Sequence, residues 1–437
     1  MKIWIRNTYF VIAVLVFLSA STFFVLLASG YNYNFLKNKF EKTSVLYVKS
    51  YPRNANIFLN DKLYKKLTPT EIIHLKPNLY DIKIEKEEYQ KWEKQFLVKP
   101  EQTVFVEEVS LFYKTPKVSI LEKGNFENLS ISPDEQNLLF YDLENSELNI
   151  FNLAEKKIIN IEENIDEIES SFWSSDSQKV LLKIDNQYFI SFIYFNEELF
   201  NLSEYISFSP KEIIWDKFNS NLIYLIANNG DLYSFDLNKK VLEATGITNV
   251  LAVKPEKDNI FYVANNGDND SLYLWNNDKE EKFLDLGVNL NYEFAWPYKD
   301  YFCLLDSNNT LYLIDPNAEE YLVNKFYNVE SSEWDLYNRT ILLKNDFEMW
   351  SYDLPTKEEI LINRFSKKIE NVFWHNNNNH VFYIIDNKAY VIELDNRDRK
   401  NIYLLENIHG SDLFLANKKG NILYHITPSG LVESIIQ

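Results

Sequence analysis

Histidine, cysteine and acidic side chains are the groups in this sequence from which a metal or catalytic site would be built. Five histidines are present: His74, His375, His380, His409 and His425. His375 and His380 flank the polar stretch 376–379, and no cluster of His, Cys, Asp or Glu has the spacing of a metal site. The single cysteine, Cys303, lies in an apolar run, so it is expected in the core and forms no intrachain disulfide. We therefore assign no catalytic, cofactor-binding or metal-ligating residue and expect no cofactor.

Two acidic stretches have simpler explanations than catalysis. Residues 265–270 are rich in side-chain oxygens but lack the closing Glu of a calcium loop, so a hairpin turn is the better interpretation. Residues 163–169 carry four carboxylates and are expected to form a solvated connection. Neither a Gly-x-Ser-x-Gly step nor a phosphate-binding glycine loop is present. The local motifs therefore favour a binding role over an enzymatic one.

A repeat of 38 to 43 residues organises the chain from Ile131 to Leu415. Its anchor positions are Ile131, Trp173, Trp215, Val253, Trp296, Trp334, Trp374 and Leu415. Each anchor ends a short apolar strand, and two or three further strands follow it before the next anchor. This period, with several short strands in each unit, is typical of a β-propeller. The sequence thus predicts an all-β fold for most of the chain.

The two ends of the repeat region predict how the ring closes. Eight anchors indicate eight blades, with seven as the alternative, but the chain ends before a fourth strand of the last blade. Residues 118–121 form an apolar strand at the distance before Ile131 where fourth strands occur elsewhere. We expect this strand to complete the C-terminal blade, because a closed ring leaves no free strand edge. The propeller is therefore predicted over residues 117–437.

The repeats resemble those of WD-repeat-like and TolB-like propellers. The residues that carry this resemblance are Ser130-Ile131-Ser132-Pro133-Asp134 and Phe172-Trp173-Ser174-Ser175-Asp176. The resemblance implies a fold and no particular activity. A ring of tryptophans could stack on a glycan, but a large side chain at one repeat position is better explained by packing between blades.

An apolar segment without charges precedes these domains. No charged residue occurs between Arg6 and Lys37, and residues 9–29 are long enough to cross a bilayer as a helix. Trp4 and the tyrosines at 31 and 33 suit the two membrane interfaces. A cleaved signal peptide is the alternative, but the apolar region is long and a small-x-small cleavage site is lacking. We expect an uncleaved anchor with a cytoplasmic tail at 1–8 and a linker at 30–43, which places the bulk of the chain outside the cytoplasm.

Residues 44–112 contain short alternating strands separated by turn residues. The Asn60-Asp61-Lys62 turn, the Thr68-Pro69 step and Leu75-Lys76-Pro77-Asn78-Leu79-Tyr80 resemble the PEGA domain family. The resemblance implies a small β-sandwich of the cell surface with no established catalytic residues. Its expected role is a spacer between the membrane segment and the propeller.

Charge is unevenly distributed and narrows the choice of partners. The chain has a formal net charge of −19, and residues 117–437 carry all of the excess acid, because residues 1–116 are net basic. Such a surface repels phosphate backbones, so nucleic acid is not an expected partner. We expect a single-pass membrane protein whose propeller binds or scaffolds an envelope protein or polysaccharide. The alternative is a glycan-active hydrolase or lyase with carboxylates in the propeller channel, which requires acidic residues from distant strands to converge there.

Overall fold

A computed structural model describes the fold. It covers residues 3–34, 39–165, 167–193, 198–257, 259–276, 279–288, 290–298, 301–335, 337, 339–407, 414–417 and 419–437, without the side chains of 3–6, 27–28, 34, 296–298, 406–407 and 414–416. The chain forms two compact units. Unit 1 comprises residues 1–116, 392–405 and 436–437, and unit 2 comprises residues 117–391 and 406–435.

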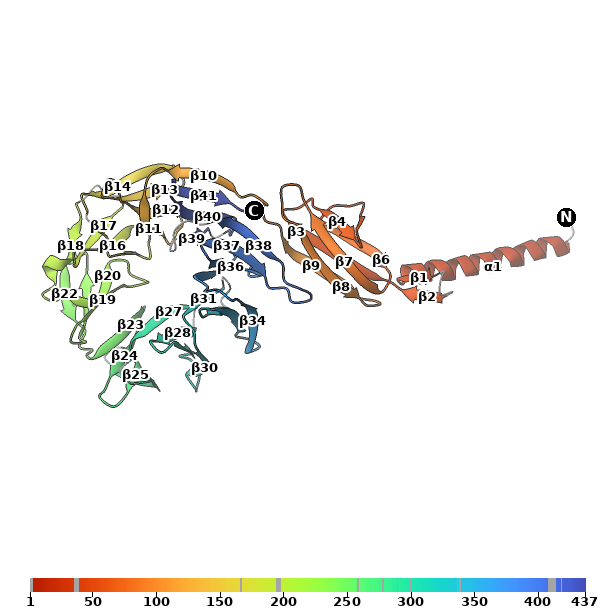
Figure 1. Cartoon of the computed structure of the whole chain (residues 1–437). Helices are drawn as coiled ribbons and strands as arrows, with labels where there is room; N and C mark the ends of the chain where they lie inside the picture. The colour runs from red at the N-terminus through yellow and green to blue at the C-terminus, as the bar shows by residue number, and fades with distance from the viewer. Residues whose placement is uncertain are drawn as a thin grey trace. The chain divides into compact units, whose positions relative to one another are not determined.

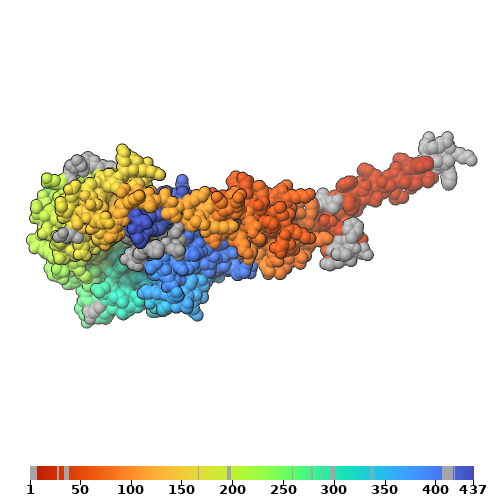
Figure 2. All heavy atoms as spheres, turned by 45° about the horizontal axis from the view of Figure 1, so that its top comes forward, coloured from red at the N-terminus to blue at the C-terminus, as the bar shows by residue number. Residues whose placement is uncertain are grey.

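Unit 1 begins with one long apolar helix, α1 (Ile3–Ala28). Its segment Asn7–Leu26 has a mean hydropathy of 2.4, and none of it is buried by other parts of the chain (Figure 2). The hydroxyl groups of Ser19 and Thr22 donate hydrogen bonds to carbonyl oxygens of the preceding helical turn. These two hydroxyl groups are therefore satisfied within the helix, as an apolar surrounding requires. A short hairpin of β1 (Tyr31–Asn34) and β2 (Lys39–Lys42) follows.

The small β domain of unit 1 consists of two sheets that enclose one core. The first sheet has the order β6 (Thr70–Leu75), β3 (Ser44–Tyr51), β9 (Thr103–Ser110), and the second the order β5 (Lys62–Leu63), β4 (Asn56–Leu59), β7 (Asn78–Glu85), β8 (Trp92–Val98). Every second residue of β3 and β8 is buried, which is the strand alternation that the sequence predicts. Leu46, Ile57, Ile84 and Trp92 pack together at its centre. Most strands are longer than the apolar runs that marked them.

Residues 392–405 fold with the small domain, although they are separated from it by about three hundred positions in the sequence. The Lys94 side chain is fully buried, and its Nζ lies 2.7 Å from Oε1 of Glu393. The indole N–H of Trp92 donates to Oε2 of the same carboxylate at 2.7 Å, and the Asn401 backbone and side chain donate to Oε1. This carboxylate is therefore fully hydrogen-bonded, which a buried ion pair needs.

Unit 2 consists of four-stranded antiparallel sheets arranged around a centre (Figure 1). The first four sheets are β11 (Phe126–Ile131), β12 (Asn137–Asp142), β13 (Glu147–Asn152), β14 (Lys157–Glu163); β15 (Ser170–Trp173), β16 (Lys179–Ile184), β17 (Gln187–Phe192), β18 (Phe200–Asn201); β19 (Pro210–Trp215), β20 (Leu222–Ala227), β21 (Leu232–Asp236), β22 (Val241–Ala244); and β23 (Val250–Glu256), β24 (Asn259–Asn265), β25 (Asp270–Asn276), β26 (Lys279–Asp285). The 3-10 helix η1 (Leu202–Tyr205) follows β18.

The next three sheets repeat this order; residues 392–405, which include most of the fourth strand of the last of them, are counted with unit 1. They are β27 (Tyr292–Tyr298), β28 (Tyr301–Asp306), β29 (Thr310–Ile314), β30 (Leu322–Tyr327); β31 (Ser331–Trp334), β32 (Thr340–Lys344), β33 (Glu348–Asp353), β34 (Glu358–Arg364); and β35 (Asn371–Trp374), β36 (His380–Ile385), β37 (Lys388–Glu393), β38 (Ile402–Asn407). Where Figure 1 labels both strands, as for β19 with β22 and β31 with β34, the first strand lies toward the centre of the ring and the fourth strand at its outside. The second strands are the most deeply buried, as in β12 and β36.

The last sheet combines both ends of unit 2. Its order is β10 (Lys117–Glu122), β41 (Gly430–Ile435), β40 (Ile422–Thr427), β39 (Phe414–Ala416). β10 runs antiparallel to β41, with Val118 opposite Ser434 and Ile120 opposite Val432. The strand that the sequence places at 118–121 therefore supplies the outer edge of the C-terminal sheet. The anchor Leu415 lies in β39, and its side chain is outside the described ones.

Gly430, the first residue of β41, lies close to the backbone at the end of β10. Its φ is +131°, and an added Cβ would lie 2.0 Å from the carbonyl oxygen of Glu122. We expect Gly430→Ala to destabilise unit 2 by about 1–3 kcal/mol, because backbone must move where the two ends pair. The measurement is urea unfolding of the detergent-solubilised full chain, with hydrogen exchange followed in peptides from β10 and β41.

Gly246 provides the matched control. Its φ is +86°, but a Cβ there would meet no atom within 4 Å. Gly246→Ala should cost only the backbone strain, about 1 kcal/mol, and leave exchange in β10 unchanged. Equal protection of β10 in the wild type and in Gly430→Ala would contradict the role of this contact.

Candidate functional site

The first strands of three neighbouring sheets, β19, β23 and β27, border a cavity of about 170 Å³ in unit 2. Two small side chains contribute to it: Ala252 and Ala295 stand immediately before their repeat anchors. At the same repeat position β15 and β35 carry Phe172 and Phe373. The hollow thus occurs where two consecutive repeats carry alanine in place of a large side chain.

Five charged side chains line this cavity together with two aromatic rings. The carboxylates are Glu212, Glu256 and Glu293, the lysines are Lys217 and Lys254, and the aromatic residues are Trp215 and Phe294. Glu212 and Glu293 occupy one repeat position, three residues before Trp215 and Trp296. Because equivalent positions in successive sheets point in equivalent directions, both carboxyl groups reach the same cavity. Both side chains remain exposed to solvent there.

The electrostatic environment makes Glu212 unusual. Although the side chain is still accessible to solvent, partial displacement of water by the surrounding protein raises the pKa of this carboxyl to about 7, with Lys211 opposing the rise and Glu293 adding to it. A neutral and an ionised form of Glu212 are therefore both populated near pH 7. In its neutral form the group donates a hydrogen bond, and in its ionised form it only accepts them.

Lys254 and Glu256 form an ion pair at another side of the cavity. Burial lowers the pKa of Lys254, and the pairing with Glu256 opposes that change. The Lys254 ammonium also lies 5.3 Å from the ring centre of Phe302 and 5.6 Å from that of Phe261. These contacts hold the ammonium group by charge and by cation–π attraction. The pair contributes no net charge to the cavity.

Repeat tryptophans connect neighbouring sheets by hydrogen bonds. The indole N–H of Trp215 donates to the carbonyl oxygen of Phe172 at 3.1 Å, and that of Trp374 to the carbonyl oxygen of Glu333 at 3.1 Å. Trp173 likewise donates to Oγ of Ser130 at 3.0 Å. These bonds support packing between sheets as the main role of the repeat tryptophans. The side chain of Trp296 lies outside the described ones.

A further carboxyl group, that of Glu333, lies on the first strand β31 of the next sheet. Burial raises its pKa to about 8, and a hydrogen bond from the Trp374 backbone opposes the rise. Glu333 stands immediately before its anchor, the repeat position that Ala252 and Ala295 occupy in the preceding sheets. Carboxyl groups with raised pKa values therefore occur on two first strands of unit 2.

Of the residues singled out in the sequence, the histidines lie elsewhere. His375 and His380 are buried, with ring centres 5.7 Å apart, and the described part of the chain contains no group of three or more His, Cys, Asp or Glu that could hold a metal ion. His409 lies outside the described residues. Cys303 is fully buried, and burial raises the pKa of its thiol. None of these groups contributes to the cavity on β19, β23 and β27.

The acidic stretches have structural roles. Residues 265–270 connect β24 to β25, where the buried Asp270 accepts hydrogen bonds from the Asn265 side chain at 2.6 Å and the Tyr292 hydroxyl at 3.1 Å. Glu169 pairs with Lys183, and this contact lowers the pKa of its carboxyl group. Asp166 is outside the described residues. Sequence analysis overlooked Glu212 and Glu293, whose only signal was a shared position three residues before a repeat Trp.

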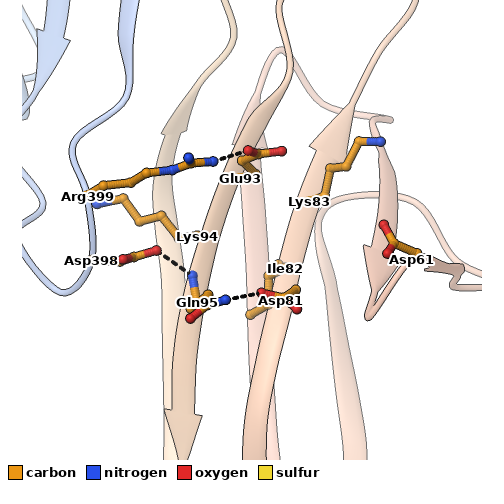
Figure 3. Close-up of a pocket in the computed structure, with 9 residues that line it drawn as sticks. All are labelled: Asp61, Asp81, Ile82, Lys83, Glu93, Lys94, Gln95, Asp398 and Arg399. Carbon is orange, nitrogen blue, oxygen red and sulfur yellow. Dashed lines mark hydrogen bonds and ion pairs between the residues drawn. The ribbon is translucent and has the colours of Figure 1, made fainter.

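A larger hollow of about 410 Å³ lies in unit 1, and its polar groups largely satisfy one another. The Arg399 guanidinium pairs with Glu93, the Gln95 backbone donates to Asp398 at 2.8 Å, and the Gln95 amide donates to Asp81 at 2.6 Å (Figure 3). These contacts connect residues 398–399 to β8. Because the charges are paired internally, this hollow offers a ligand less than the cavity in unit 2.

Comparison with known proteins identifies both β regions. The PEGA domain model matches residues 43–109, so this part of unit 1 is similar to PEGA domains. The C-terminal WD40 domain of Sif2 is similar in structure to 74% of this chain over 98% of its own length, with 12% identity and a TM-score of 0.53. This similarity shows that unit 2 has a β-propeller fold. No curated protein matches the chain.

Two further solved structures resemble the chain less closely. The β-propeller domain of Cps50 (Swd1) from Myceliophteria thermophila has 8% identity and a TM-score of 0.46, covering 74% of this chain and 99% of that one. An oligogalacturonate lyase from Vibrio parahaemolyticus has 11% identity and a TM-score of 0.43, covering 66% of this chain and 93% of that one.

Proposed function

We propose that this protein is a single-pass, membrane-anchored binding or scaffolding protein of the cell envelope, with its propeller outside the cytoplasm as the interaction surface. The main observation behind this proposal is the cavity on β19, β23 and β27. It combines space for a ligand, aromatic side chains in its lining and two carboxyl groups that form no ion pair within the described part of the chain. The apolar α1 and the PEGA domain support the placement in the envelope. An eight-bladed ring closed by β10 and a β-sandwich spacer complete the proposed architecture.

Capture of an envelope saccharide by the full chain tests this proposal. The detergent-solubilised protein is immobilised and incubated with a soluble polysaccharide and peptidoglycan-fragment fraction, and the retained sugars are analysed by mass spectrometry. Ala295→Phe places a large side chain in the cavity and is expected to reduce the retained amount at least tenfold, because the hollow is small. The proposal would be contradicted if the wild type and Ala295→Phe retained the same sugars equally. It would also be contradicted if neither protein retained any sugar.

Two controls accompany this experiment. Leu361→Phe enlarges an exposed side chain on the outer strand β34, and it should leave capture unchanged. Circular dichroism of Ala295→Phe checks that a loss of capture is not a loss of folding. The anchor is tested by alkaline carbonate extraction of membranes from expressing cells: we expect the chain to stay in the pellet, and its release into the wash would oppose an integral membrane segment.

A second candidate function is acid–base cleavage of a glycan. The presence of the Glu212 and Glu293 carboxyl groups in one cavity favours it. Glycan cleavage commonly uses two carboxyl groups, one of which is kept protonated by a raised pKa. Glu212 has such a pKa, and Glu293 lies near enough to raise it. Shortened fragments in the capture experiment that disappear in Glu212→Gln would establish cleavage in place of simple binding.

A further inference from the structure

The cavity in unit 2 contains negative charge that no neighbouring cation neutralises by direct contact. Within the described part of the chain, the carboxyl groups of Glu212 and Glu293 form neither a hydrogen bond nor an ion pair, whereas Glu256 is paired with Lys254. The charge of Lys211 favours the ionised form of Glu212, and Lys217 also lines the cavity, but neither lysine pairs directly with these two carboxyl groups. Two carboxyl groups that share a hollow repel one another when both are ionised. A ligand that brings a positive charge between them would remove this repulsion and gain attraction to both.

The aromatic walls favour the same kind of ligand. The indole N–H of Trp215 is already bonded to the Phe172 carbonyl oxygen, so Trp215 offers its ring surface to a ligand. Phe294 adds a second ring to the lining. Aromatic faces attract cations through their quadrupole, and carboxylates accept the N–H bonds of an ammonium group. Rings and carboxylates together form the usual environment of an organic cation.

Other ligand classes fit less well. An anion would meet Glu212 and Glu293 and be repelled. A neutral polyol would donate hydrogen bonds to the ionised carboxylates but bring no positive charge to offset the repulsion between them. A metal ion lacks a third ligand, since no group of three suitable side chains occurs among the described residues. The volume of about 170 Å³ is below the roughly 300–1,000 Å³ of pockets for drug-sized ligands, so a single small ring or a short chain fits.

We propose that this cavity binds a primary ammonium group carried on a small ring of amino-sugar size, held between Glu212 and Glu293 and flanked by Trp215 and Phe294. This inference rests on the proposed function and specifies its ligand class. The ammonium group donates hydrogen bonds to both carboxylates, and the ring of the ligand packs against the aromatic side chains. Ala252 and Ala295 leave the room that the ring occupies.

Isothermal titration calorimetry of the full chain in detergent micelles at about pH 7 tests the inference with D-glucosamine, D-glucose and N-acetylglucosamine. These sugars differ at one substituent, which is an ammonium in the first and neutral in the others. An amine with a pKa near that of an α-amino group, about 7.7, is mostly cationic at this pH. We expect glucosamine to bind at least tenfold more tightly than either neutral sugar.

Variants separate charge recognition from shape. Glu212→Gln and Glu293→Gln keep the size of the side chain and remove its charge, so each should weaken glucosamine binding at least fivefold and leave glucose binding within twofold. Glu243→Gln is the matched control, because Glu243 is exposed on the outer strand β22 of the sheet that carries Glu212. It should change neither affinity.

Three results would overturn the inference. Equal binding of glucosamine and glucose would make the cavity a neutral-sugar site and leave the proposed function intact. Glucosamine binding that survives both Gln substitutions would place the ammonium elsewhere. Absence of glucosamine binding would refute the ammonium ligand alone if the wild type still captures envelope sugars and Ala295→Phe does not. If the wild type captures no envelope sugar, the proposed function itself is refuted.

Discussion

Glu393→Gln is expected to destabilise unit 1 by about 3–5 kcal/mol, because it leaves the buried Lys94 ammonium without its main counter-charge. The Lys94 side chain is fully buried and that of Glu393 is 4% exposed, so water cannot take over the lost interaction. Asp395 remains nearby, with its carboxylate 3.7 Å from the ammonium. That distance is too long for a hydrogen bond of comparable strength.

The measurement is hydrogen exchange of the detergent-solubilised full chain, followed in peptides that cover β7 and β8 in increasing urea. An ion pair of equal length but greater exposure provides the matched control. Lys83 and Glu85 are also 2.7 Å apart, but their side chains are 30% and 37% exposed. Glu85→Gln should therefore change stability by less than about 1 kcal/mol. Similar losses in the two variants would show that burial does not determine the contribution of the pair.

A double substitution separates the pair from its surroundings. Lys94→Met with Glu393→Gln removes both charges, and we expect it to recover at least half of the loss caused by Glu393→Gln alone, because no uncompensated ion remains. The Trp92 indole still finds an amide oxygen at position 393 with which to bond. A double variant as unstable as the single one would indicate that the hydrogen bonds of Glu393, and not its charge, hold residues 392–405 to the small domain.

Glu333→Gln is expected to make unit 2 more stable at pH 8–9 and to leave it nearly unchanged at pH 5. Burial raises the pKa of Glu333 from 4.5 to about 8, so between these values the folded chain holds a proton that the unfolded chain has lost. The free energy of unfolding therefore decreases as pH rises through this window. The stabilising contribution of the raised pKa is fully present below about pH 4.5 and is lost above pH 8.

The expected size follows from the same change in pKa. A rise from 4.5 to about 8 sets a ceiling of about 5 kcal/mol, and the part-exposed position of Glu333 reduces the expected gain in the variant to about 2–3 kcal/mol. Urea unfolding of the wild type and the variant at about pH 5, 7 and 9 measures the difference in their free energies of unfolding. The other titrating groups contribute equally to both proteins and drop out of this difference. Glu358→Gln, on the exposed outer strand β34, is the control and should shift stability by less than about 0.5 kcal/mol. If the difference in the free energy of unfolding were the same at all three pH values, the raised pKa of Glu333 would be refuted.

Much of the fold was predictable from local sequence. Alternation of apolar and polar residues is a direct result of strand geometry, and it marked β3 and β7 before any tertiary information. The repeat of about forty residues marked the sheets of unit 2, since each repeat forms one sheet. Counting residues outward from the anchors also identified the strand at 118–121, which pairs with β41. These features depend on neighbours in sequence or on a regular spacing.

The candidate site was not predictable in the same way. Glu212 and Glu293 belong to sheets that are two repeats apart, and nothing in either local sequence distinguishes them from surface glutamates. Their proximity and the raised pKa of Glu212 arise because first strands converge at the centre of the ring and displace water there. The sequence led us to expect that a channel site would need carboxylates from distant strands, but it did not identify which ones.

The sequence by itself determined which stretches form strands, how often the sheet repeats and that an apolar helix comes first, because these depend on side-chain period and on composition. The tertiary structure decided which charged groups meet. Lys94 finds its counter-charge at Glu393, and Glu212 comes close to Glu293, in each case across a long stretch of chain. Electrostatic interactions depend on distance and on exclusion of water, and both are fixed only once the sheets have packed.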